Sequence, residues 1–350
     1  MSKAAAEYIK TGAIKDYIFE IEHLIGERKV FILTDSNTHL YLDALINKTP
    51  LINRSKIFKI EAGENSKTLK SAELIWKYII DNKADRNSLL INFGGGMITD
   101  LGGFVASTFK RGIQYINVPT SLLSMVDASV GGKTGVNLNH EKNQIGTFSY
   151  PKMVICDPEL IKTQSKEQIL SGFAEVLKHG LIANRAYWIY CTKNSFENLD
   201  FNKIINESIK IKAKIVDEDP LEKGIRKVLN FGHTIGHAIE TLLISKNNEI
   251  LHGHAIAAGI YMESFISHKT QGLSQEDLRE IQGFIKTRFH KLPFEKADIK
   301  TILEIMKNDK KRKNDRHNFS LISSIGKATY DNYIDEKLIE LALMDYLMMK

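Results

Sequence analysis

The sequence predicts an α/β amino-terminal domain built on a mostly parallel sheet, followed by a mainly α-helical carboxyl-terminal domain. In the first part of the chain, short β-rich runs alternate with segments of helical periodicity, which is typical of βαβ units. Residues 1–160 are therefore expected to form a doubly wound, Rossmann-like nucleotide-binding domain. Helical patterns dominate from about Pro158 onward, so residues 161–350 are expected to form the helical domain, after a tight hinge near residues 155–165.

Five β-rich runs are the expected strands of the first domain: KVFIL (29–33), KIFKI (56–60), SLLINF (88–93), IQYINV (113–118) and MVIC (153–156). Helical patterns follow the first three runs, at residues 37–47, 66–82 and 97–108. The second domain contains the helical segments EQILSGFAEVLKHGLI, NKIINESIKIKAKIV and HAIAAGIYMESFISH, and its first convincing strand is FSLI at residues 319–322. We find no internal repeat and no low-complexity linker.

Composition places the chain among globular proteins. Its 350 residues are 43% hydrophobic, far from the composition of disordered chains. The amino terminus lacks the apolar core of a signal peptide, and no run approaches the roughly 18 apolar residues of a membrane span, so a cytoplasmic location is expected. Cys156 and Cys191 are too few for a disulfide framework and lack zinc-type spacing. Any metal must therefore be held by histidines and carboxylates.

The net charge of +6 includes a dense basic run at residues 307–317. This run also contains Asp309 and Asp315, and no aromatic residues interleave to stack bases. We interpret it as a solvated loop and expect neither a nucleic-acid nor a membrane partner. Moderate basicity also suits an enzyme with anionic ligands, because positive clefts concentrate phosphates and carboxylates.

A glycine loop directly follows the expected strand at residues 88–93. Gly94, Gly95 and Gly96 precede a helical segment, and a helix amino terminus offers free N–H groups to a phosphate. The dinucleotide fingerprint requires a further glycine where Thr99 stands, so the loop indicates either a pyrophosphate site or a structural turn. Polar residues also follow the first two expected strands, at the sheet edge where open sheets bind ligands: Asp35, Asn37, Glu64 and Lys67.

The segment VGGKTG at residues 130–135 resembles the end of a P-loop. A P-loop would require glycine where Asp127 stands, so an ATPase is not supported. The polar residues of this region are suited to contacting phosphate or hydroxyl oxygens. They are Asp127, Lys133, Lys142 and Asn143, and an ordinary surface loop is the alternative.

Several candidate metal ligands lie near one another in the second domain. At about 100° per residue, Arg226, Asn230, His233 and His237 would share one narrow helical stripe, which is poor core material. Two histidines and one carboxylate would make a catalytic zinc site. His233 and His237 are both possible ligands, whereas only one residue of the pair His252 and His254 should face a metal, because their side chains would point about 160° apart on a helix. Glu175 is the candidate carboxylate, although it could instead only pair with Lys178.

Taken together, these motifs closely resemble the 3-dehydroquinate synthase family, the zinc- and NAD-dependent cyclases of the shikimate pathway. The resemblance runs from about Asp35 to Gly326 and rests on GGGMITDLGGF (94–104), RG (111–112), VPTSLL (118–123), VDASVGGKTGVN (126–137), KN (142–143), SGFAEVLKHGLI (171–182), RKVLNFGHTIGHAIE (226–240) and LHG (251–253).

The resemblance implies a role for each matching residue. The zinc ligands would be Glu175, His233 and His252. The catalytic residues would be His237 for proton transfer, Glu222 as a further acid or base, and Lys133. The substrate contacts would be Arg111, Asp127, Lys133, Asn143, Lys178, Lys212, Arg226, Asn230 and Lys310. NAD would contact Asp35, Asn37, Glu64, Lys67, Gly95, Gly96, Asp100, Thr120, Ser121, Lys142 and Thr163.

The resemblance also implies a reaction, that of a carbon–oxygen lyase. Family members convert 3-deoxy-D-arabino-heptulosonate 7-phosphate to 3-dehydroquinate and phosphate by transient oxidation with NAD, elimination of phosphate, re-reduction and aldol closure. Zinc, or else cobalt, would be the metal, and a homodimer is the expected assembly. Two residues depart from the family pattern, namely His254 beside an implied ligand and Glu141 beside Lys142.

Three alternatives are weaker than this interpretation. A sibling cyclase such as 2-deoxy-scyllo-inosose synthase acts on a substrate without a carboxylate, and Lys212 and Arg226 argue against it. A polyol dehydrogenase would not need so many phosphate-binding residues. A nucleic-acid-binding protein would leave the histidine cluster unexplained.

Overall fold

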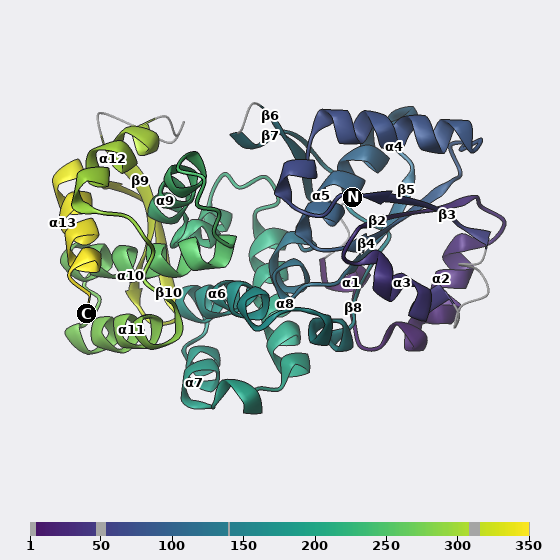
Figure 1. Cartoon of the computed structure of the whole chain (residues 1–350). Coiled ribbons are helices and arrows are strands. Elements are labelled where there is room, and N and C mark those ends of the chain that lie inside the picture. Colours follow the sequence, from purple (N-terminus) through teal and green to yellow (C-terminus); the bar gives the residue numbers. More distant parts are fainter. Residues whose placement is uncertain (1–4, 47–53, 139–140, 308–315, 350) are drawn as a thin grey trace. The chain divides into compact units, whose positions relative to one another are not determined.

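The structure is a computed structural model that describes residues 5–46, 54–138, 141–307 and 316–349 (Figure 1). The chain divides into two compact units. Unit 1 comprises Met1–Ser165 and Phe201–Ala213, and unit 2 comprises Lys166–Asp200 and Lys214–Lys350. The division therefore falls after Ser165 rather than after residue 160, and Phe201–Ala213, expected in the helical domain, packs with the α/β unit.

Unit 1 is built on a six-stranded sheet in which all pairings are parallel, as predicted. Its strands in spatial order are β1 (Ile9–Thr11), β8 (Met153–Cys156), β5 (Gln114–Pro119), β4 (Leu89–Gly94), β2 (Val30–Asp35) and β3 (Lys56–Ile60). The five predicted strands are all present within one or two residues, whereas β1 was not predicted. The predicted Rossmann-like fold of this unit is confirmed.

Helices cover both faces of this sheet and explain why its central strands are buried and mainly apolar. Along β2, Phe31 and Leu33 join a core cluster with α4 (Leu69–Asp81) and α5 (Gly96–Thr108). The alternate residues Val30 and Ile32 join a second cluster with α2 (Ile18–Ile25) and α3 (His39–Ile46). Strands buried on both faces read as continuous hydrophobic runs, which is why the sequence revealed them so clearly.

The order of the strands defines where unit 1 can bind a ligand. From β2 the chain moves outward to β3 and then returns to β4 on the other side of β2. This reversal is the topological switch point of a doubly wound sheet, and ligands bind at the carboxyl ends of the strands beside it. Asp35 ends β2, and Gly94 ends β4.

Smaller elements complete unit 1. An antiparallel hairpin of β6 (Lys133–Leu138) and β7 (Glu141–Phe148) follows the second glycine-rich segment and was not predicted. The remaining short helices are α1 (Ala5–Tyr8), η1 (Ile14–Tyr17), η3 (Glu64–Ser66), η4 (Phe109–Arg111), the π-helical turn η5 (Ser124–Ala128) and η6 (Pro158–Thr163).

Unit 2 is mainly helical, as predicted. Its helices are α6 (Lys166–Ala183), α7 (Arg185–Lys193), α9 (His233–Ser245), α10 (His252–Thr270), α11 (Gln275–Arg288), α12 (Ile299–Lys307) and α13 (Glu336–Leu347), and α8 (Phe201–Glu218) enters it after Ala213. An antiparallel hairpin of β9 (His317–Ser324) and β10 (Lys327–Ile334) also belongs to it, together with η7 (Phe196–Asn198), η8 (Ile225–Asn230) and η9 (Lys296–Asp298).

Helix α10 is the central helix of unit 2. Residues 255–264 are buried without interruption, and the helix contacts α6, α9, α11, α13 and β9. A helix that is apolar on all sides must lie inside a protein core or a membrane. No helix in the part of the chain that the structure describes combines the length and apolar content that a membrane crossing requires.

The predicted single helical stripe from Arg226 to His237 is wrong. Arg226 and Asn230 lie on the 3₁₀ helix η8, whereas His233 and His237 lie on α9. Gly232 separates the two helices with a φ of 82°, a left-handed conformation that glycine adopts without steric cost. The chain therefore changes direction inside the motif.

We expect Gly102→Ala in α5 to lower the free energy of unfolding by about 1–3 kcal/mol, because overpacking a core is destabilising. An added Cβ would lie 1.9 Å from Asn92 Oδ1. The buried Asn92 amide donates to Asn117 Oδ1 at 2.8 Å, so moving it breaks a bond between β4 and β5. Urea unfolding of the variant measures the effect.

The matched control is Gly283→Ala in α11, an exposed helical position where, apart from the local helix backbone, no described residue has a heavy atom within 4 Å of an added Cβ. This change should raise the free energy of unfolding by up to about 1 kcal/mol, through helix propensity. Equal effects at the two positions would contradict the packing explanation.

Candidate functional site

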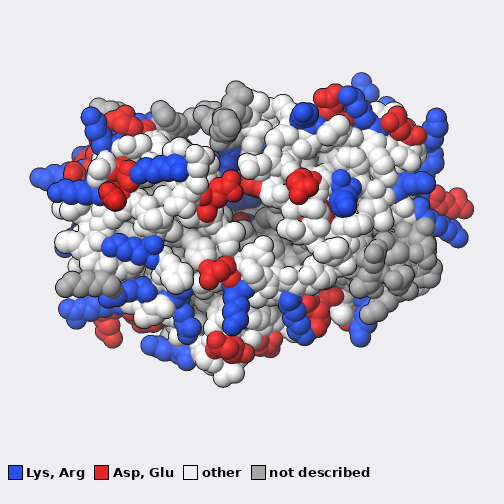
Figure 2. Space-filling view, viewed as in Figure 1, with Lys and Arg blue, Asp and Glu red and all other residues white. Residues whose placement is uncertain are grey.

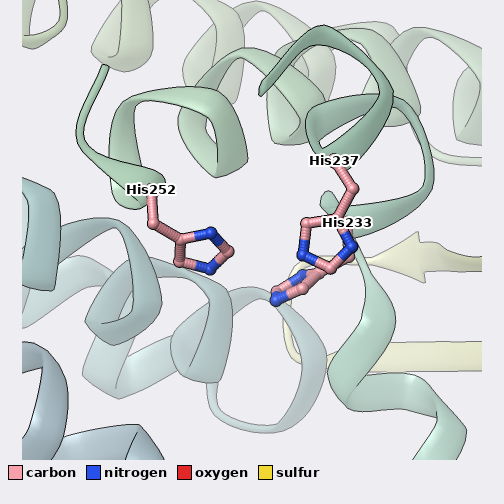
Figure 3. Close-up of side chains that lie close together, drawn as sticks. All are labelled: His233, His237 and His252. Atoms are coloured by element: carbon pink, nitrogen blue, oxygen red, sulfur yellow. The ribbon is translucent and has the colours of Figure 1, made fainter. Parts of the chain in front are cut away.

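Three histidine rings converge in unit 2. His233 and His237 project from the first turns of α9, and His252 is the first residue of α10 (Figure 3). One ring nitrogen from each lies within 4.8 Å of the others, and the ring centroids are 4.9–5.6 Å apart. Such a cluster can hold a metal ion or exchange protons.

Glu175 of α6 adds a carboxylate to two of these histidines. The side chain has no exposed surface, and its Oε1 lies 3.4 Å from His233 Nε2 and 3.8 Å from His252 Nε2. No donor among the described residues makes a hydrogen bond to Oε1. Two ligand atoms bound tetrahedrally at about 2.0–2.1 Å from one zinc ion would be about 3.3–3.4 Å apart. The donor set and spacing therefore fit a shared divalent cation.

The second ring nitrogens of these two histidines have partners of their own. His252 Nδ1 lies 3.3 Å from Glu240 Oε2, and His233 Nδ1 lies 3.2 Å from the carbonyl oxygen of Phe231. Contacts of this kind fix the orientation of a metal-binding imidazole and leave Nε2 for the metal. His237 is more exposed, and no ion pair connects it with Glu175 among the described residues.

Glu240 was not identified as a site residue from the sequence, although its helical spacing from His233 and His237 points to it. It is buried, and on α9 it follows His233 and His237 at the i, i+4, i+7 spacing of one helical face. Extending the polar stripe by one more turn would have found it.

Glu175 also pairs with Lys178, the alternative that the sequence offered. Oε2 of Glu175 contacts Lys178 Nζ, and both side chains are almost completely buried. A buried carboxylate requires such a partner, because an unpaired buried charge is costly. The lysine and the histidines contact different oxygens, so the two interpretations are compatible.

His254 is directed to different residues from His252. Its Nε2 lies 3.3 Å from Glu167 Oε2, and its ring packs on Phe289 at 5.8 Å. Burial lowers the pKa of His254, although the Glu167 carboxylate opposes that shift. As expected from helical geometry, only one histidine of the pair faces Glu175.

A compact loop before α9 holds Arg226, Asn230 and Glu222. Arg226 is buried, and its Nη1 donates to the Pro220 carbonyl oxygen at 2.7 Å. Asn230 Nδ2 donates to Glu222 Oε1 at 2.8 Å. Glu222 has a φ of 57°, an uncommon conformation for a residue other than glycine. Strain of this kind is often kept at functional positions.

Asp219 organises this loop and was not predicted. Its carboxylate accepts backbone N–H groups from Lys223, Gly224 and Arg226 at 2.7–3.1 Å. Burial alone would raise the pKa of Asp219, but these hydrogen bonds and the Arg226 charge hold it below its ordinary value.

The β9–β10 hairpin contacts η8 through side-chain hydrogen bonds and an ion pair. Lys227 Nζ contacts both carboxylate oxygens of Asp331 at 2.8–2.9 Å, and Ser320 Oγ donates to the Lys227 carbonyl oxygen at 2.6 Å. These contacts fix the backbone on one side of Arg226. Because β10 was not predicted, this support could not be foreseen.

Unit 1 brings many of the predicted NAD contacts to the carboxyl edge of its sheet. Asp35 Oδ1 accepts the N–H groups of Asn37 and Thr38 at 2.9 and 2.8 Å. Thr38 Oγ1 in turn donates to the Phe93 carbonyl oxygen at 3.3 Å, which links the ends of β2 and β4. Gly95 is the N-cap of α5 and Gly96 its first residue. Beside them, Thr120 donates its N–H to the Gly94 carbonyl oxygen, and Ser121 follows.

Lys67 is the centre of a second network at this edge. Its buried Nζ donates to Asp100 Oδ2 at 2.7 Å and to Asn143 Oδ1 at 2.6 Å, and Glu64 lies 3.8 Å away. Burial alone would lower the pKa of Lys67, but the Asp100 and Glu64 carboxylates raise it above its ordinary value. Lys67 therefore stays charged.

Asn137 connects this network to the hairpin and was missed. Its Nδ2 donates to Glu64 Oε1, and its Oδ1 accepts the N–H of Asn143, both at 2.9 Å. Asn143 has a φ of 55°. The structure thus joins Asn143, predicted to contact substrate, to residues predicted to contact NAD.

Asp127 and Lys212 form an ion pair although 85 residues separate them. Lys212 Nζ donates to Asp127 Oδ1 at 2.5 Å and to its backbone oxygen at 2.7 Å. Lys212 belongs to unit 1, whereas Arg226 and Asn230 belong to unit 2.

The other predicted residues of unit 1 are more scattered. Lys133 begins β6 and is exposed, Lys142 is exposed on β7, and Thr163 ends η6. Arg111 is exposed in the turn that precedes β5. That turn lies at the amino end of a parallel strand, so unit 1 does not bring Arg111 to the carboxyl edge.

Two predicted features lie outside the described residues or on their border. Lys310 and most of the basic run at 307–317 fall in the segment that the structure does not describe. On the face shown in Figure 2, lysines and arginines of the described residues are interspersed with aspartates and glutamates.

Comparisons with known proteins agree on one family. The family models for the amino-terminal and carboxyl-terminal parts of 3-dehydroquinate synthase match residues 57–171 and 172–312. A 3-dehydroquinate synthase of Parabacteroides distasonis is 43% identical over 333 residues, which cover 93% of this chain and 94% of that protein.

Solved structures share the fold. A 2-deoxy-scyllo-inosose synthase complexed with carbaglucose-6-phosphate, NAD+ and Co2+ matches with a TM-score of 0.81 at 23% identity, over 96% of each chain. A 2-epi-5-epi-valiolone synthase from Streptomyces hygroscopicus, with NAD+ and Zn2+ bound, matches with a TM-score of 0.85 at 19% identity, over 98% of this chain and 97% of that one.

We expect Asp219→Asn to lower the free energy of unfolding at neutral pH by about 1–2 kcal/mol, because hydrogen bonds to an ionised acceptor are lost. Since the folded pKa is depressed, the wild-type carboxylate contributes its full stability above about pH 4, the unfolded pKa. That contribution is lost as the pH falls through the lower folded value. Urea unfolding between pH 7 and about pH 2 should show a constant difference above about pH 4 that shrinks as the pH falls further, and a difference that stays constant over the whole range would contradict the assignment.

Proposed function

Because the chain belongs to the 3-dehydroquinate synthase family, we propose that this enzyme converts 3-deoxy-D-arabino-heptulosonate 7-phosphate to 3-dehydroquinate and phosphate, a step of the shikimate pathway. The observation that carries the proposal is the arrangement of Glu175, His233 and His252 in unit 2. Family membership identifies the class of reaction, and this donor set supplies the metal chemistry that the reaction needs.

We assign the metal to these three residues. Their atoms have the identity and spacing of a site with two histidines and one carboxylate, which leaves positions open for a substrate oxygen. A bound zinc or cobalt ion would supply Lewis acidity that lowers the pKa of a neighbouring hydroxyl, and NAD would supply a reversible hydride acceptor. Glu175 and Lys178 together would keep the local charge balanced.

NAD is assigned to the carboxyl edge of the unit 1 sheet. Gly95 and Gly96 offer the amino terminus of α5 to a pyrophosphate, as helix termini do for phosphates in general. Asp35, at the end of β2, is suited to accept a hydrogen bond from a ribose hydroxyl. Lys67, Asp100 and Glu64 would hold the edge in position through their network.

The anionic groups of the substrate require cationic and amide side chains. Arg226 is buried, and its planar guanidinium matches the two oxygens of a carboxylate, so it is suited to bind one. Lys133 and Lys178 are suited to phosphate and hydroxyl oxygens, and Asn143 and Asn230 to hydroxyl groups. The buried guanidinium of Arg226 favours a carboxylate-bearing substrate over the sugar phosphate of a sibling cyclase, which has no carboxylate.

His237 is assigned to proton transfer. It lies beside His233 and His252 but is more exposed, and an imidazole can both accept and donate a proton. Glu222 is assigned as a further acid or base, because its carboxylate already accepts a hydrogen bond from Asn230. Returning the hydride to the substrate leaves no net change in NAD.

The reaction itself is the test of the proposed activity. The purified enzyme, supplied with the heptulosonate phosphate, catalytic NAD and zinc, should release one phosphate per dehydroquinate formed without accumulating NADH. Stoichiometric NADH would instead identify a dehydrogenase. Turnover of glucose 6-phosphate in its place would identify a sibling cyclase.

A second measurement tests the ligand assignment. We expect His233→Ala and His252→Ala to lose bound zinc, and His237→Ala to retain it while turning over at least about 100-fold more slowly, as loss of an acid–base group does. Metal content is measured by mass spectrometry after gel filtration. His254→Ala is the matched control and should retain zinc, because this residue faces Glu167. Loss of zinc in His237→Ala together with retention in His252→Ala would overturn the assignment.

A further inference from the structure

Glu263 is a further buried carboxylate of unit 2 and is not among the candidate metal ligands. It lies on α10, eleven residues beyond His252, and has no exposed surface. Its Oε2 accepts the N–H of Gly232 at 2.6 Å, and its Oε1 accepts the N–H of Ile235 at 3.0 Å. Both donors belong to the amino terminus of α9.

These two bonds replace the cap that α9 lacks. The first N–H groups of a helix have no partner within the helix, and an N-cap serine, threonine or aspartate usually supplies one. The N-cap of α9 is Gly232, which has no side chain. Glu263 binds both the N-cap N–H and the N3 N–H, the two groups that a capping box satisfies with two local side chains. A negative charge at this end of a helix is also favourable.

The reason for a remote cap lies in how closely α9 and α10 approach. A Cβ on Gly259 of α10 would lie 1.8 Å from the carbonyl oxygen of Gly232. A Cβ on Gly232 itself would lie 2.7 Å from the Ile260 side chain, and the φ of 82° would strain it further. A capping side chain therefore cannot be placed at position 232. The close approach brings the rings of His233 and His252 to 5.6 Å.

His233 and Thr234 are the two residues between Gly232 and Ile235, whose N–H groups Glu263 binds. The backbone direction of His233 is thus set by bonds on both sides, at Gly232 and Ile235. Because Glu263 and His252 share α10, the same helix that carries one ligand also fixes the start of the helix that carries another.

We propose that Glu263 is a positioning residue of the metal site, which sets the geometry of His233 relative to His252 and thereby the affinity for the metal. This inference rests on the proposed metal ligands but not on the identity of the substrate. It also assigns Glu263 a role beyond stabilising the fold.

The test is Glu263→Gln in the full-length protein. A glutamine keeps one acceptor oxygen but turns an NH2 group toward the other backbone N–H, so one of the two bonds is lost. We expect the affinity for zinc, measured by competition with a chelator well below the unfolding temperature, to fall about 10–100-fold, as for other residues that orient metal ligands. The visible spectrum of the cobalt-loaded variant should differ from that of the wild type.

Asp277→Asn is the matched control. Asp277 of α11 is also a buried carboxylate of unit 2. Its Oδ1 lies 2.9 Å from Nη1 of Arg185. Its substitution should lower the stability while leaving zinc affinity and the cobalt spectrum unchanged. If Glu263→Gln does not fold, Glu263→Asp serves instead, because it keeps the charge but cannot reach both N–H groups, and its zinc affinity should still fall.

The outcomes separate the two proposals. A folded Glu263 variant with wild-type zinc affinity and cobalt spectrum overturns the positioning role, as does an equal loss of affinity in Asp277→Asn. Failure of the wild-type protein to bind zinc stoichiometrically overturns the metal site itself, and with it this inference. Zinc binding without dehydroquinate formation overturns the proposed reaction and leaves the role of Glu263 intact.

Discussion

The structure of unit 2 depends on the burial of the Glu175 carboxylate. Placing a charge where no water reaches is costly unless it is paired and hydrogen-bonded. Lys178 on the same helix meets one oxygen, while His233 and His252 from two other helices face the second. Three helices therefore converge on one side chain, and the packing of α6, α9 and α10 can be understood as the means of bringing these partners to it.

Glycines make this convergence possible. Gly253 donates its N–H to Ser171 Oγ at 2.9 Å, and a Cβ there would lie 1.8 Å from the Ser171 carbonyl oxygen. Gly259 is equally close to Gly232. These residues lower helix propensity, by up to about 1 kcal/mol each relative to alanine. Their presence is explained by contacts between backbones rather than by local preference.

Periodicity and composition predicted the parallel sheet and the helical second half, because buried strands and amphipathic helices leave local signals in the sequence. The same signals could not reveal β6, β7 and β10, whose residues are partly polar on both faces. Nor could they reveal the break at Gly232, since a polar stripe that continues across a turn looks like one helix. The resemblance to a family named Glu175, His233 and His252 as the candidate ligands, and the structure shows that His252 lies near Glu175 whereas His254 lies near Glu167. The contacts of Asp219, Asn137 and Glu240 required the fold, because their partners are set by chain geometry and not by spacing alone.

The three candidate ligands lie on three separate helices, and this has a consequence for how metal binding is coupled to folding. Glu175, His233 and His252 reach one another only after α6, α9 and α10 have packed, and their contacts close long loops of chain. An unfolded chain thus presents no ready-made cluster to a metal ion. A metal that binds here selects the native state, and each tenfold excess of free metal over the dissociation constant adds about 1.4 kcal/mol to the free energy of unfolding. Metal availability would then set the fraction of unit 2 that is folded, in addition to how fast the enzyme works.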